Sequence, residues 1–396
     1  MSRHSDTPKI LWGSPLPPVR SGVADYAAEL LPELAKAARL RVLRPPEWTP
    51  PPEWPHQLET VPCDEERQDD EIEVVHLGNN PYHLWLLHRL RRGGVVVVLH
   101  DAVLHHLLVE DAAEGGAAAA DLESELERSH GQAGRALSAA RTAGHHGFLD
   151  PFLFPARASF FRYASAVIVH SRWAAELVRS EVESLPVHRV ELAAADPGPL
   201  DRAAIRRRFG IPDQERVLMH LGFLTRQKGL EEILTGFGAA VRCGVQARLM
   251  IVGEGRRAEH LKEAARSAGL EDRVWFTGWI KPEHFLSVPA AADLGVVLRT
   301  PSAGETSAAV LRFLACGVPV AVGGRKQFLE WPEAAAPRLT PGPAAAPDLA
   351  RLLGDVGGPG WDDRRQAARA AYERFHRPED IARRFVGILS NLKETS

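Results

Sequence analysis

The chain has 396 residues, of which 45% are hydrophobic and 25% charged, and its net charge is −3. This length and composition are typical of a globular protein with two domains, and the charge gives no reason to expect a nucleic-acid partner. Three widely spaced cysteines, an N-terminus without an apolar signal-peptide core and a longest strongly apolar run of only Val95–Leu99 argue against a secreted or membrane-spanning protein. We therefore expect a cytoplasmic protein.

Short apolar strands alternate with helical stretches along the first half of the chain. Each predicted strand precedes an amphipathic or alanine-rich stretch, as Ile10–Trp12 precedes Val23–Ala38. Continuous apolar strands with helices between them indicate a parallel sheet covered on both faces. The predicted strands of this half are Ile10–Trp12, Arg41–Leu43, Val74–Leu77, Val95–Leu99, Val167–His170 and Arg189–Leu192.

A second series of strands follows the linker Ala193–Pro199, whose proline and glycine residues mark a domain boundary. We therefore predict an α/β protein with two Rossmann-like, doubly wound domains, residues 1–195 and 196–377. The carboxyl ends of their strands would face a central cleft. The predicted strands of the second series are Val217–Leu221, Arg248–Val252, Val274–Phe276, Leu294–Leu298 and Val318–Val322.

Two segments do not fit the alternation, and a third stretch is predicted to be a loop. The proline-rich and acidic stretch Leu43–Glu73 is predicted to be a surface connection, with its carboxylates solvated rather than bound to metal. The alanine-rich stretch Gly115–Gly147 is predicted to be a helical insertion. Ala334–Pro347, rich in proline and alanine, is predicted to be a loose surface loop.

The loop Ser302–Ser307 leads from a predicted strand into an apolar helix. Small residues at such a place let the backbone approach a ligand, and the free amides of Thr306 and Ser307 at the helix start suit an anion. Glu305 adds a carboxylate that can accept hydrogen bonds from hydroxyl groups. Phosphate donors beside a hydroxyl acceptor are typical of a nucleotide-sugar site, although an ordinary capped turn has the same residues.

Two turns of the first half hold further candidates. Gly22 lies between the first strand and its helix, where a glycine brings a backbone amide close to a phosphate or simply makes a turn. His100 and Asp101 follow Val95–Leu99, at a strand end where ligands bind in open α/β sheets. The alternatives are a helix cap by Asp101 and a metal site with His105 and His106, whose spacing does not match the helical pair of a zinc site.

The loop after Val217–Leu221 carries two cations, Arg226 and Lys228, just before a helix. Such charges suit a leaving diphosphate, because negative charge develops on it during the reaction. In a loop, however, lysine and arginine are more often solvated, and we expect Lys228 to have little packing.

These motifs, in this order, resemble those of the retaining glycosyltransferases of family 4, which have the GT-B fold. The resemblance runs from Ser21-Gly22-Val23 and Tyr26 through Ser165–Ser171 and the Lys228-Gly229 pair to Arg299–Val322. It implies sugar transfer from a nucleotide diphosphate with retention at the anomeric carbon, without a metal or other cofactor. It also implies that the closing helix, 378–396, returns to the first domain.

The resemblance assigns roles to individual residues. His100 would contact the transferred sugar, Gly22 the donor diphosphate, and Lys228 would take the position of the family lysine, with Arg226 as a possible substitute for a missing charge. Glu305, Thr306 and Ser307 would bind sugar and phosphate. The loops Gly253-Glu254-Gly255 and Gly278-Trp279-Ile280 would hold the nucleotide, which makes Gly253, Glu254, Trp279 and Ile280 candidate nucleotide contacts.

Two departures from the family pattern keep another function open. Phe223 stands where the family has arginine. The family also has two glutamates in its signature helix, and Arg312 replaces the second of them; an arginine cannot accept hydrogen bonds from ribose hydroxyls as a glutamate does. These departures keep open a nucleotide-sugar-binding protein without catalysis, and a sugar-nucleotide epimerase of the same fold is a separate alternative. The donor, the acceptor and the oligomeric state are not specified. The basic cluster His88–Arg92 could touch anionic lipid at most peripherally, and a solvated face is the simpler interpretation.

Overall fold

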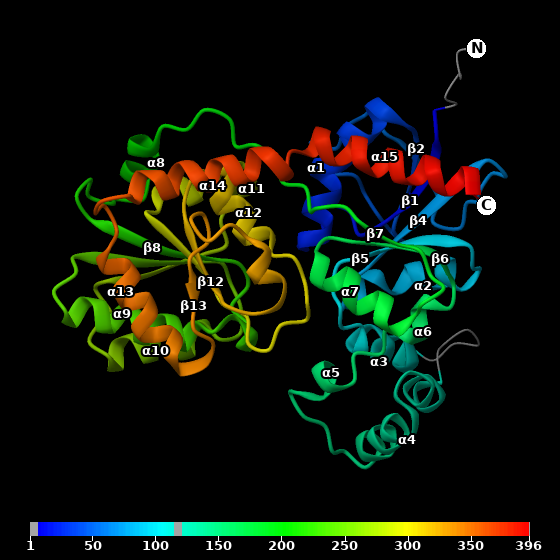
Figure 1. Cartoon of the computed structure of the whole chain (residues 1–396), viewed down its shortest axis with the longest axis horizontal. Coiled ribbons are helices and arrows are strands. Elements are labelled where there is room, and N and C mark those ends of the chain that lie inside the picture. The colour runs from blue at the N-terminus through cyan, green and yellow to red at the C-terminus, as the bar shows by residue number, and fades with distance from the viewer. Residues whose placement is uncertain (1–6, 115–120, 396) are drawn as a thin grey trace. The chain divides into compact units, whose positions relative to one another are not determined.

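The computed structural model describes residues 7–114 and 121–395, so the first six residues of the predicted insertion Gly115–Gly147 lie outside the described residues. Contacts divide the chain into two compact units (Figure 1). The first comprises the described residues up to Ala193, the loop Ala303–Thr306 and the end of the chain from Pro378. The second comprises Ala194–Ser302 and Ser307–Arg377.

A parallel seven-stranded sheet forms the centre of the first unit, in the order β3-β2-β1-β4-β5-β6-β7. All five residues of β5 are buried, as expected for a central strand covered on both faces. The strands are β1 (Lys9–Gly13), β2 (Arg39–Leu43), β3 (Glu59–Val61), β4 (Glu71–Leu77), β5 (Val95–Leu99), β6 (Ala164–Val169) and β7 (Val187–Arg189).

Helices flank this sheet, and α1 and α7 begin at side-chain caps. The hydroxyl of Ser21 accepts from the Val23 amide at the start of α1, and that of Ser171 accepts from the Ala174 amide at the start of α7. The last helix, α15, packs beside α1 (Figure 1). The helices are α1 (Gly22–Ala37), η1 (Pro81–His83), α2 (Leu84–Arg91), α3 (His105–Glu114), α4 (Leu122–Thr142), α5 (Asp150–Leu153), α6 (Ala158–Phe161), α7 (Arg172–Glu181) and α15 (Pro378–Thr395).

The second unit contains a parallel six-stranded sheet in the order β10-β9-β8-β11-β12-β13. Its strands are β8 (Arg216–Leu221), β9 (Ala247–Val252), β10 (Val274–Gly278), β11 (Leu294–Val297), β12 (Val320–Gly323) and β13 (Arg338–Leu339). Its helices are α8 (Arg202–Arg208), η2 (Arg226–Lys228), α9 (Leu230–Arg242), α10 (Ala258–Ser267), α11 (Pro282–Phe285), η3 (Val288–Ala291), α12 (Ala308–Ala315), η4 (Lys326–Glu330), η5 (Gly342–Ala344), α13 (Ala345–Gly354) and α14 (Trp361–Phe375).

Two segments predicted to lack structure contribute strands. Leu43–Glu73 contains β3, which pairs with β2, and Ala334–Pro347 contains β13 and the start of α13. Both strands lie at sheet edges and are only two or three residues long, too short for a periodic pattern. Part of the acidic stretch is also not solvated, because the buried Glu71 carboxylate accepts two bonds from Arg41, each 3.1 Å long.

The cluster His88–Arg92 is a solvated face only in part: His88 and Arg92 are exposed, Arg89 is buried, and all three arginines are paired with carboxylates. The fully buried Arg89 guanidinium donates to Glu73 at 2.6 Å, Arg91 pairs with Asp111, and Arg92 lies 3.0 Å from Glu66. Within residues 7–114 and 121–395, no helix is both long enough and apolar enough to cross a membrane.

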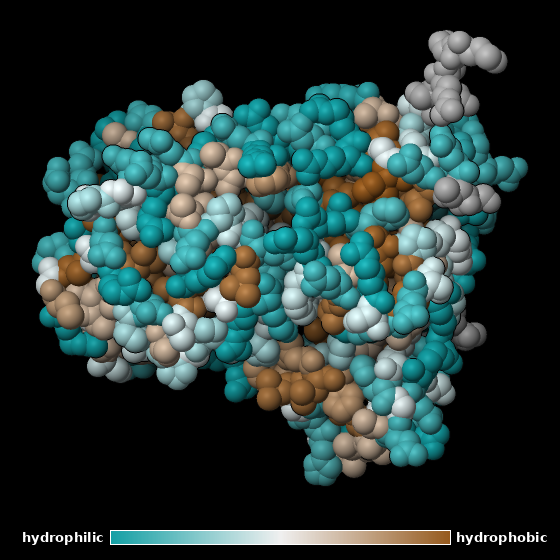
Figure 2. Space-filling model, in the orientation of Figure 1, coloured by the Kyte–Doolittle hydropathy of each residue, from teal (hydrophilic) through white to brown (hydrophobic). Residues whose placement is uncertain are grey.

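The insertion after α3 is helical, as predicted for its described residues, but α4 is interrupted at Gly131, where φ is +60°. Apolar side chains are exposed on and beside α5. Leu149 and Leu153 are 52% and 67% exposed, and a brown patch lies over this helix in Figure 2.

Candidate functional site

In the second unit, the loops after β8 and β9 pack directly on one another. The Leu224 amide donates to the Glu254 carbonyl at 2.8 Å, and a Cβ at Gly253 would lie 2.2 Å from the Gly222 carbonyl oxygen. Gly253 also has a φ of +135°, which only glycine adopts without strain. The close approach of the two backbones therefore requires glycine at position 253.

Lys228, on the loop after β8, is only 7% exposed, so the expectation of a loosely packed lysine is wrong. A Cβ at Gly222 would be 3.5 Å from its Nζ, so the ammonium group is next to the loop backbone. Burial, then the positive charge of Lys228 and that of Arg299, lower the pKa of His220 to about 3. His220 is therefore neutral, and Lys228 and Arg299 both act on it electrostatically. Arg226, in contrast, is exposed.

Two further strand-end loops join this region. The Thr300 amide, after β11, donates to the Gln227 carbonyl at 2.8 Å. The Gln327 amide group, after β12, donates to the Ser302 hydroxyl at 2.9 Å, and Lys326 Nζ donates to the Ser302 carbonyl at 3.3 Å. Sequence reasoning missed Arg299 and Lys326. Their positions just after β11 and β12 were the available signal, because ligands of parallel sheets bind at the carboxyl ends of strands.

The remaining candidates of the second unit lie on neighbouring loops. The Gly253 amide donates to the Gly278 carbonyl at 3.0 Å, which brings the Glu254 loop beside the Trp279-Ile280 loop. Trp279 is 42% exposed, as is Phe223 after β8. Both rings are therefore available to a ligand at this edge.

The start of α12 holds Ser307, whose buried hydroxyl makes no side-chain cap bond. Farther along α12, Arg312 is buried, and its guanidinium carbon lies 5.7 Å from the centre of the Phe285 ring. Arg312 therefore points toward α11, the helix that follows the Trp279-Ile280 loop.

The loop Ala303–Thr306 packs within the first unit, although it lies between β11 and α12 in the chain. The Ala102 amide donates to the Ala303 carbonyl at 2.7 Å, and a Cβ at Gly304 would lie 2.3 Å from the Trp173 ring. These contacts hold the loop that carries the half-buried Glu305. One of them is made by Ala102, which is two residues after His100 in the chain.

His100 lies at the end of β5 in a group of aromatic rings. His76 Nδ1 and His100 Nε2 are 2.8 Å apart, and the ring centres of Tyr26 and His170 lie 5.3 Å and 4.9 Å from that of His100. Burial and then the neighbouring His170 and His76 lower the pKa of His100 well below its ordinary value. His100 is therefore neutral at physiological pH, suited to hydrogen bonding rather than to providing a positive charge.

Asp101, next to His100, contacts the loop after β4. Helix α3 begins only at His105, and the Asp101 carboxylate accepts from the Asn79 amide at 2.8 Å. The oxygen that accepts from the first-turn amides of α3 belongs to Asn79, which is 2.8 Å from the His106 amide. Asn79 therefore joins the Asp101 carboxylate to the first turn of α3, and the helix-cap interpretation of Asp101 stays a prediction.

Gly22 is the first residue of α1 and is exposed. A Cβ at this position would have no atom within 4 Å of it, so packing does not require glycine at this helix start. Among residues 7–114 and 121–395, no three histidine, cysteine or carboxylate side chains are placed to hold a metal ion, and this includes His105 and His106.

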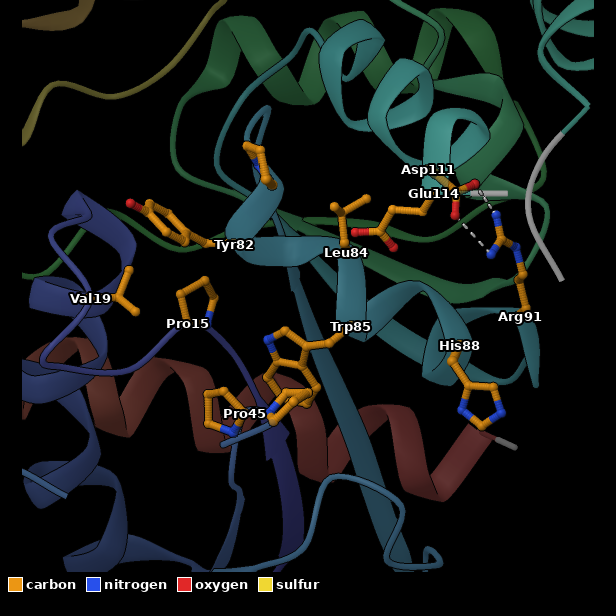
Figure 3. Close-up of a pocket in the computed structure, with 12 residues that line it drawn as sticks. Pro15, Val19, Pro45, Tyr82, Leu84, Trp85, His88, Arg91, Asp111 and Glu114 are labelled. Carbon is orange, nitrogen blue, oxygen red and sulfur yellow. Dashed lines mark hydrogen bonds and ion pairs between the residues drawn. The ribbon is translucent and has the colours of Figure 1, made fainter. Parts of the chain in front are cut away.

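A groove of about 620 Å³ opens in the first unit beside the loops that follow β1, β2 and β4 (Figure 3). Most of its lining is apolar or aromatic, and one end carries the Arg91–Asp111 ion pair and the Glu114 carboxylate. Its lining residues are Pro15, Val19, Pro45, Pro46, Pro81, Tyr82, Leu84, Trp85, His88, Arg91, Asp111 and Glu114.

Part of the second unit matches a family of known proteins. Residues 215–339 match the family model of glycosyl transferases group 1. The alpha-D-kanosaminyltransferase of Streptomyces kanamyceticus is 28% identical over 179 residues, which cover 43% of this chain and 45% of that protein. The chain spans less than half the length of the curated relatives it matches first.

Solved structures match nearly the whole chain. Sucrose-phosphate synthase from Thermosynechococcus elongatus superimposes with a TM-score of 0.67 at 17% identity, over 99% of this chain and 100% of that one. Anabaena HepE in complex with UDP and glucose gives a TM-score of 0.63 at 16% identity, over 96% and 99% of the two chains. This chain therefore has the two-domain α/β GT-B fold, and its residues 215–339 resemble the glycosyl transferases group 1 family.

Proposed function

We propose that this protein is a retaining glycosyltransferase that moves a sugar from a nucleoside diphosphate sugar to an acceptor hydroxyl. The observation that carries the proposal is the joined loop pair of β8 and β9, with the buried Lys228 ammonium next to the Gly222 backbone. The group 1 match of residues 215–339 contains this whole region, and the structurally similar HepE binds UDP and glucose.

The diphosphate would lie at the carboxyl edge of the second sheet. Lys228, Arg226 and Arg299 would offset its charge, and the amides of Thr306 and Ser307 would donate to it, as would the Gly22 amide at the start of α1. Gly253, Glu254, Trp279 and Ile280 would contact the nucleoside. In this proposal side chains and helix starts, rather than a metal ion, neutralise the diphosphate.

The transferred sugar would contact His100 and Glu305. The bond between the anomeric carbon and the diphosphate oxygen breaks, and the acceptor oxygen bonds to the same face of that carbon. The acceptor proton passes to the departing diphosphate oxygen. Lys228 lowers the barrier because the diphosphate gains negative charge during this step.

The acceptor would occupy the groove of the first unit. Its exposed Tyr82 and its Trp85 ring, set between proline rings, suit the apolar faces of a sugar or cyclitol ring (Figure 3). The groove begins at Pro15 and Val19, on the loop that leads to Gly22, so an acceptor there would lie beside the proposed diphosphate contact.

Donor binding and turnover test this proposal in sequence. Thermal shift against a panel of nucleotide sugars, including UDP-glucose, identifies the donor, because a ligand that binds the folded state raises the melting temperature. Release of nucleoside diphosphate on addition of sugar and cyclitol acceptors then measures transfer. Consumption of the donor without an acceptor and without diphosphate release would indicate an epimerase instead, and tight binding without turnover across the panel would indicate a binding protein.

His100→Ala tests the share of the first unit in this chemistry. We expect turnover per folded molecule to fall while affinity for the bare diphosphate stays near the wild-type value, since the bare diphosphate lacks the sugar; the melting temperature should fall as well, because His76 loses its hydrogen-bond partner. Normal turnover per folded molecule would remove His100 from the site.

A further inference from the structure

His76 is a buried histidine inside an otherwise apolar part of β4. Its side chain is 0% exposed, and its ring centre lies 4.1 Å from that of Trp12. Strands β4 and β5 are parallel neighbours in which His76 pairs with Val98. His100 lies two residues beyond Val98, so both histidines point to the same face of the sheet.

The contact between the two histidines is a hydrogen bond, because His76 Nδ1 and His100 Nε2 are 2.8 Å apart. Burial is the main cause that lowers the pKa of both rings well below the ordinary value, so neither is protonated twice at neutral pH. One proton must therefore lie between the two nitrogens, and it belongs to either His76 or His100.

The surroundings of His76 distinguish the two cases. Its Nε2 atom is buried and has no hydrogen-bond partner. If His100 held the shared proton, the second proton of the pair would be on His76 Nε2, as a buried donor without an acceptor. If His76 donates from Nδ1, only a lone pair is left at Nε2, and unpaired buried donors are the rarer of the two in proteins.

We infer that His76 is a positioning residue that donates from Nδ1 to His100 Nε2 and so holds His100 as its Nδ1–H tautomer. His100 Nδ1 is not among the buried unpartnered atoms of the described residues, and it is the nitrogen that remains for a ligand. His100 therefore offers a hydrogen-bond donor, rather than an acceptor, to an oxygen of the bound sugar. The contribution to turnover rests on the proposed function, whereas the tautomer does not.

Neighbouring histidines follow the same pattern. His83 Nδ1 lies 2.9 Å from the His76 carbonyl oxygen, and His170 Nδ1 lies 2.8 Å from the Val190 carbonyl oxygen. A carbonyl oxygen only accepts, so both rings carry their proton on Nδ1. His100 differs because its partner is another imidazole, whose nitrogen can either donate or accept the hydrogen bond.

Nitrogen-15 NMR of histidine-labelled protein tests the tautomer directly, with His100→Ala used to assign the signal. We expect His100 to carry its proton on Nδ1 in the wild type. We expect the same in His76→Asn, whose amide nitrogen can donate from the position of Nδ1, and loss of this preference in His76→Leu. A wild-type His100 protonated on Nε2 would overturn the inference.

Turnover of UDP-glucose, or of the donor that the panel identifies, tests the consequence. His76→Leu should lower kcat about tenfold, the order expected for one misdirected hydrogen bond, with little change in affinity for UDP. His76→Asn should stay within about threefold of wild type. His83→Gln is the matched control, since it alters a buried imidazole whose hydrogen bond goes to a backbone oxygen.

Equal loss of kcat in all three variants would mean that these histidines only support packing, and would overturn the positioning role. If His76→Leu does not fold, the wild-type and His76→Asn spectra still decide the tautomer. If no nucleotide sugar is turned over, the proposed function fails, while the NMR result decides the inference about His76 separately.

Discussion

Replacement of Lys228 by methionine separates the charge of this residue from its packing. Lys228 is only 7% exposed, so an alanine would leave a cavity, whereas methionine fills most of the space of the lysine stem. The ammonium group is already desolvated beside the Gly222 backbone. A charge-assisted hydrogen bond to a phosphate oxygen in such surroundings contributes about 1.5–3 kcal/mol.

Lys228→Met should therefore weaken binding of the nucleoside diphosphate by about tenfold to a hundredfold, as measured by titration calorimetry. Its melting temperature should stay near that of the wild type. The pKa of His220 should rise from about 3, because the positive charge of Lys228 contributes to its lowering.

Arg226→Met is the matched control, since it removes a cation from the same loop but from an exposed position. Exposed ion pairs contribute about 1 kcal/mol or less, so this variant should lose less than about fivefold in affinity. A Lys228→Met protein that folds normally and binds UDP as tightly as the wild type would refute the diphosphate role of Lys228.

Three further expectations follow from other parts of the structure. Glu305→Gln should keep the fold and diphosphate binding but lower turnover on the order of a hundredfold, since one oriented electrostatic contact to the sugar is lost; unchanged turnover would exclude Glu305 from the site. Gly253→Ala should lower the free energy of unfolding, measured by urea denaturation, by roughly 1–3 kcal/mol or more, because its Cβ would meet the Gly222 oxygen at 2.2 Å. Gly22→Ala is the control and should leave the free energy of unfolding unchanged, because the space around Gly22 is open. Burial lowers the pKa of His83 from 6.5 to about 4, so the unfolded chain binds a proton that the folded protein does not. Above about pH 6.5, His83 is neutral in both states and does not change the free energy of unfolding. As the pH falls to about 4, protonation of the unfolded chain lowers the free energy of unfolding by up to about 3 kcal/mol. In urea denaturation between about pH 4 and 6.5, the free energy of unfolding should depend less on pH in His83→Gln than in the wild type.

The two-sheet fold was predictable because both sheets are parallel. Buried parallel strands are continuous apolar runs, and runs such as Val95–Leu99 stand out between amphipathic helices. The short edge strands Glu59–Val61 and Arg338–Leu339 carry no such pattern, because they are exposed on one side and their pairing depends on neighbours distant in the chain. Of the strand predicted at Arg189–Leu192, only Arg189 lies in a strand, the edge strand β7 (Val187–Arg189).

The candidate site was predictable only where it follows a strand. Lys228, His100 and Glu305 stand just after apolar runs, and a sequence alone shows this. The burial of Lys228 could not be read in the same way, since it depends on the approach of the loops after β8 and β9. The loop Ala303–Thr306 was assigned to the second half by chain order, yet its contacts with Ala102 and Trp173 place it within the first unit.

His76 illustrates a signal that was present in the sequence but could not be used without the sheet order. A histidine within an apolar strand needs a hydrogen-bond partner, because buried polar groups rarely lack one. Any strand of the sheet could have supplied that partner. Once β5 is known to pair with β4 in the register His76 to Val98, the diagonal position on the same face is His100. The register of β4 against β5 therefore places the buried His76 next to His100, the strand-end residue that we propose contacts the ligand.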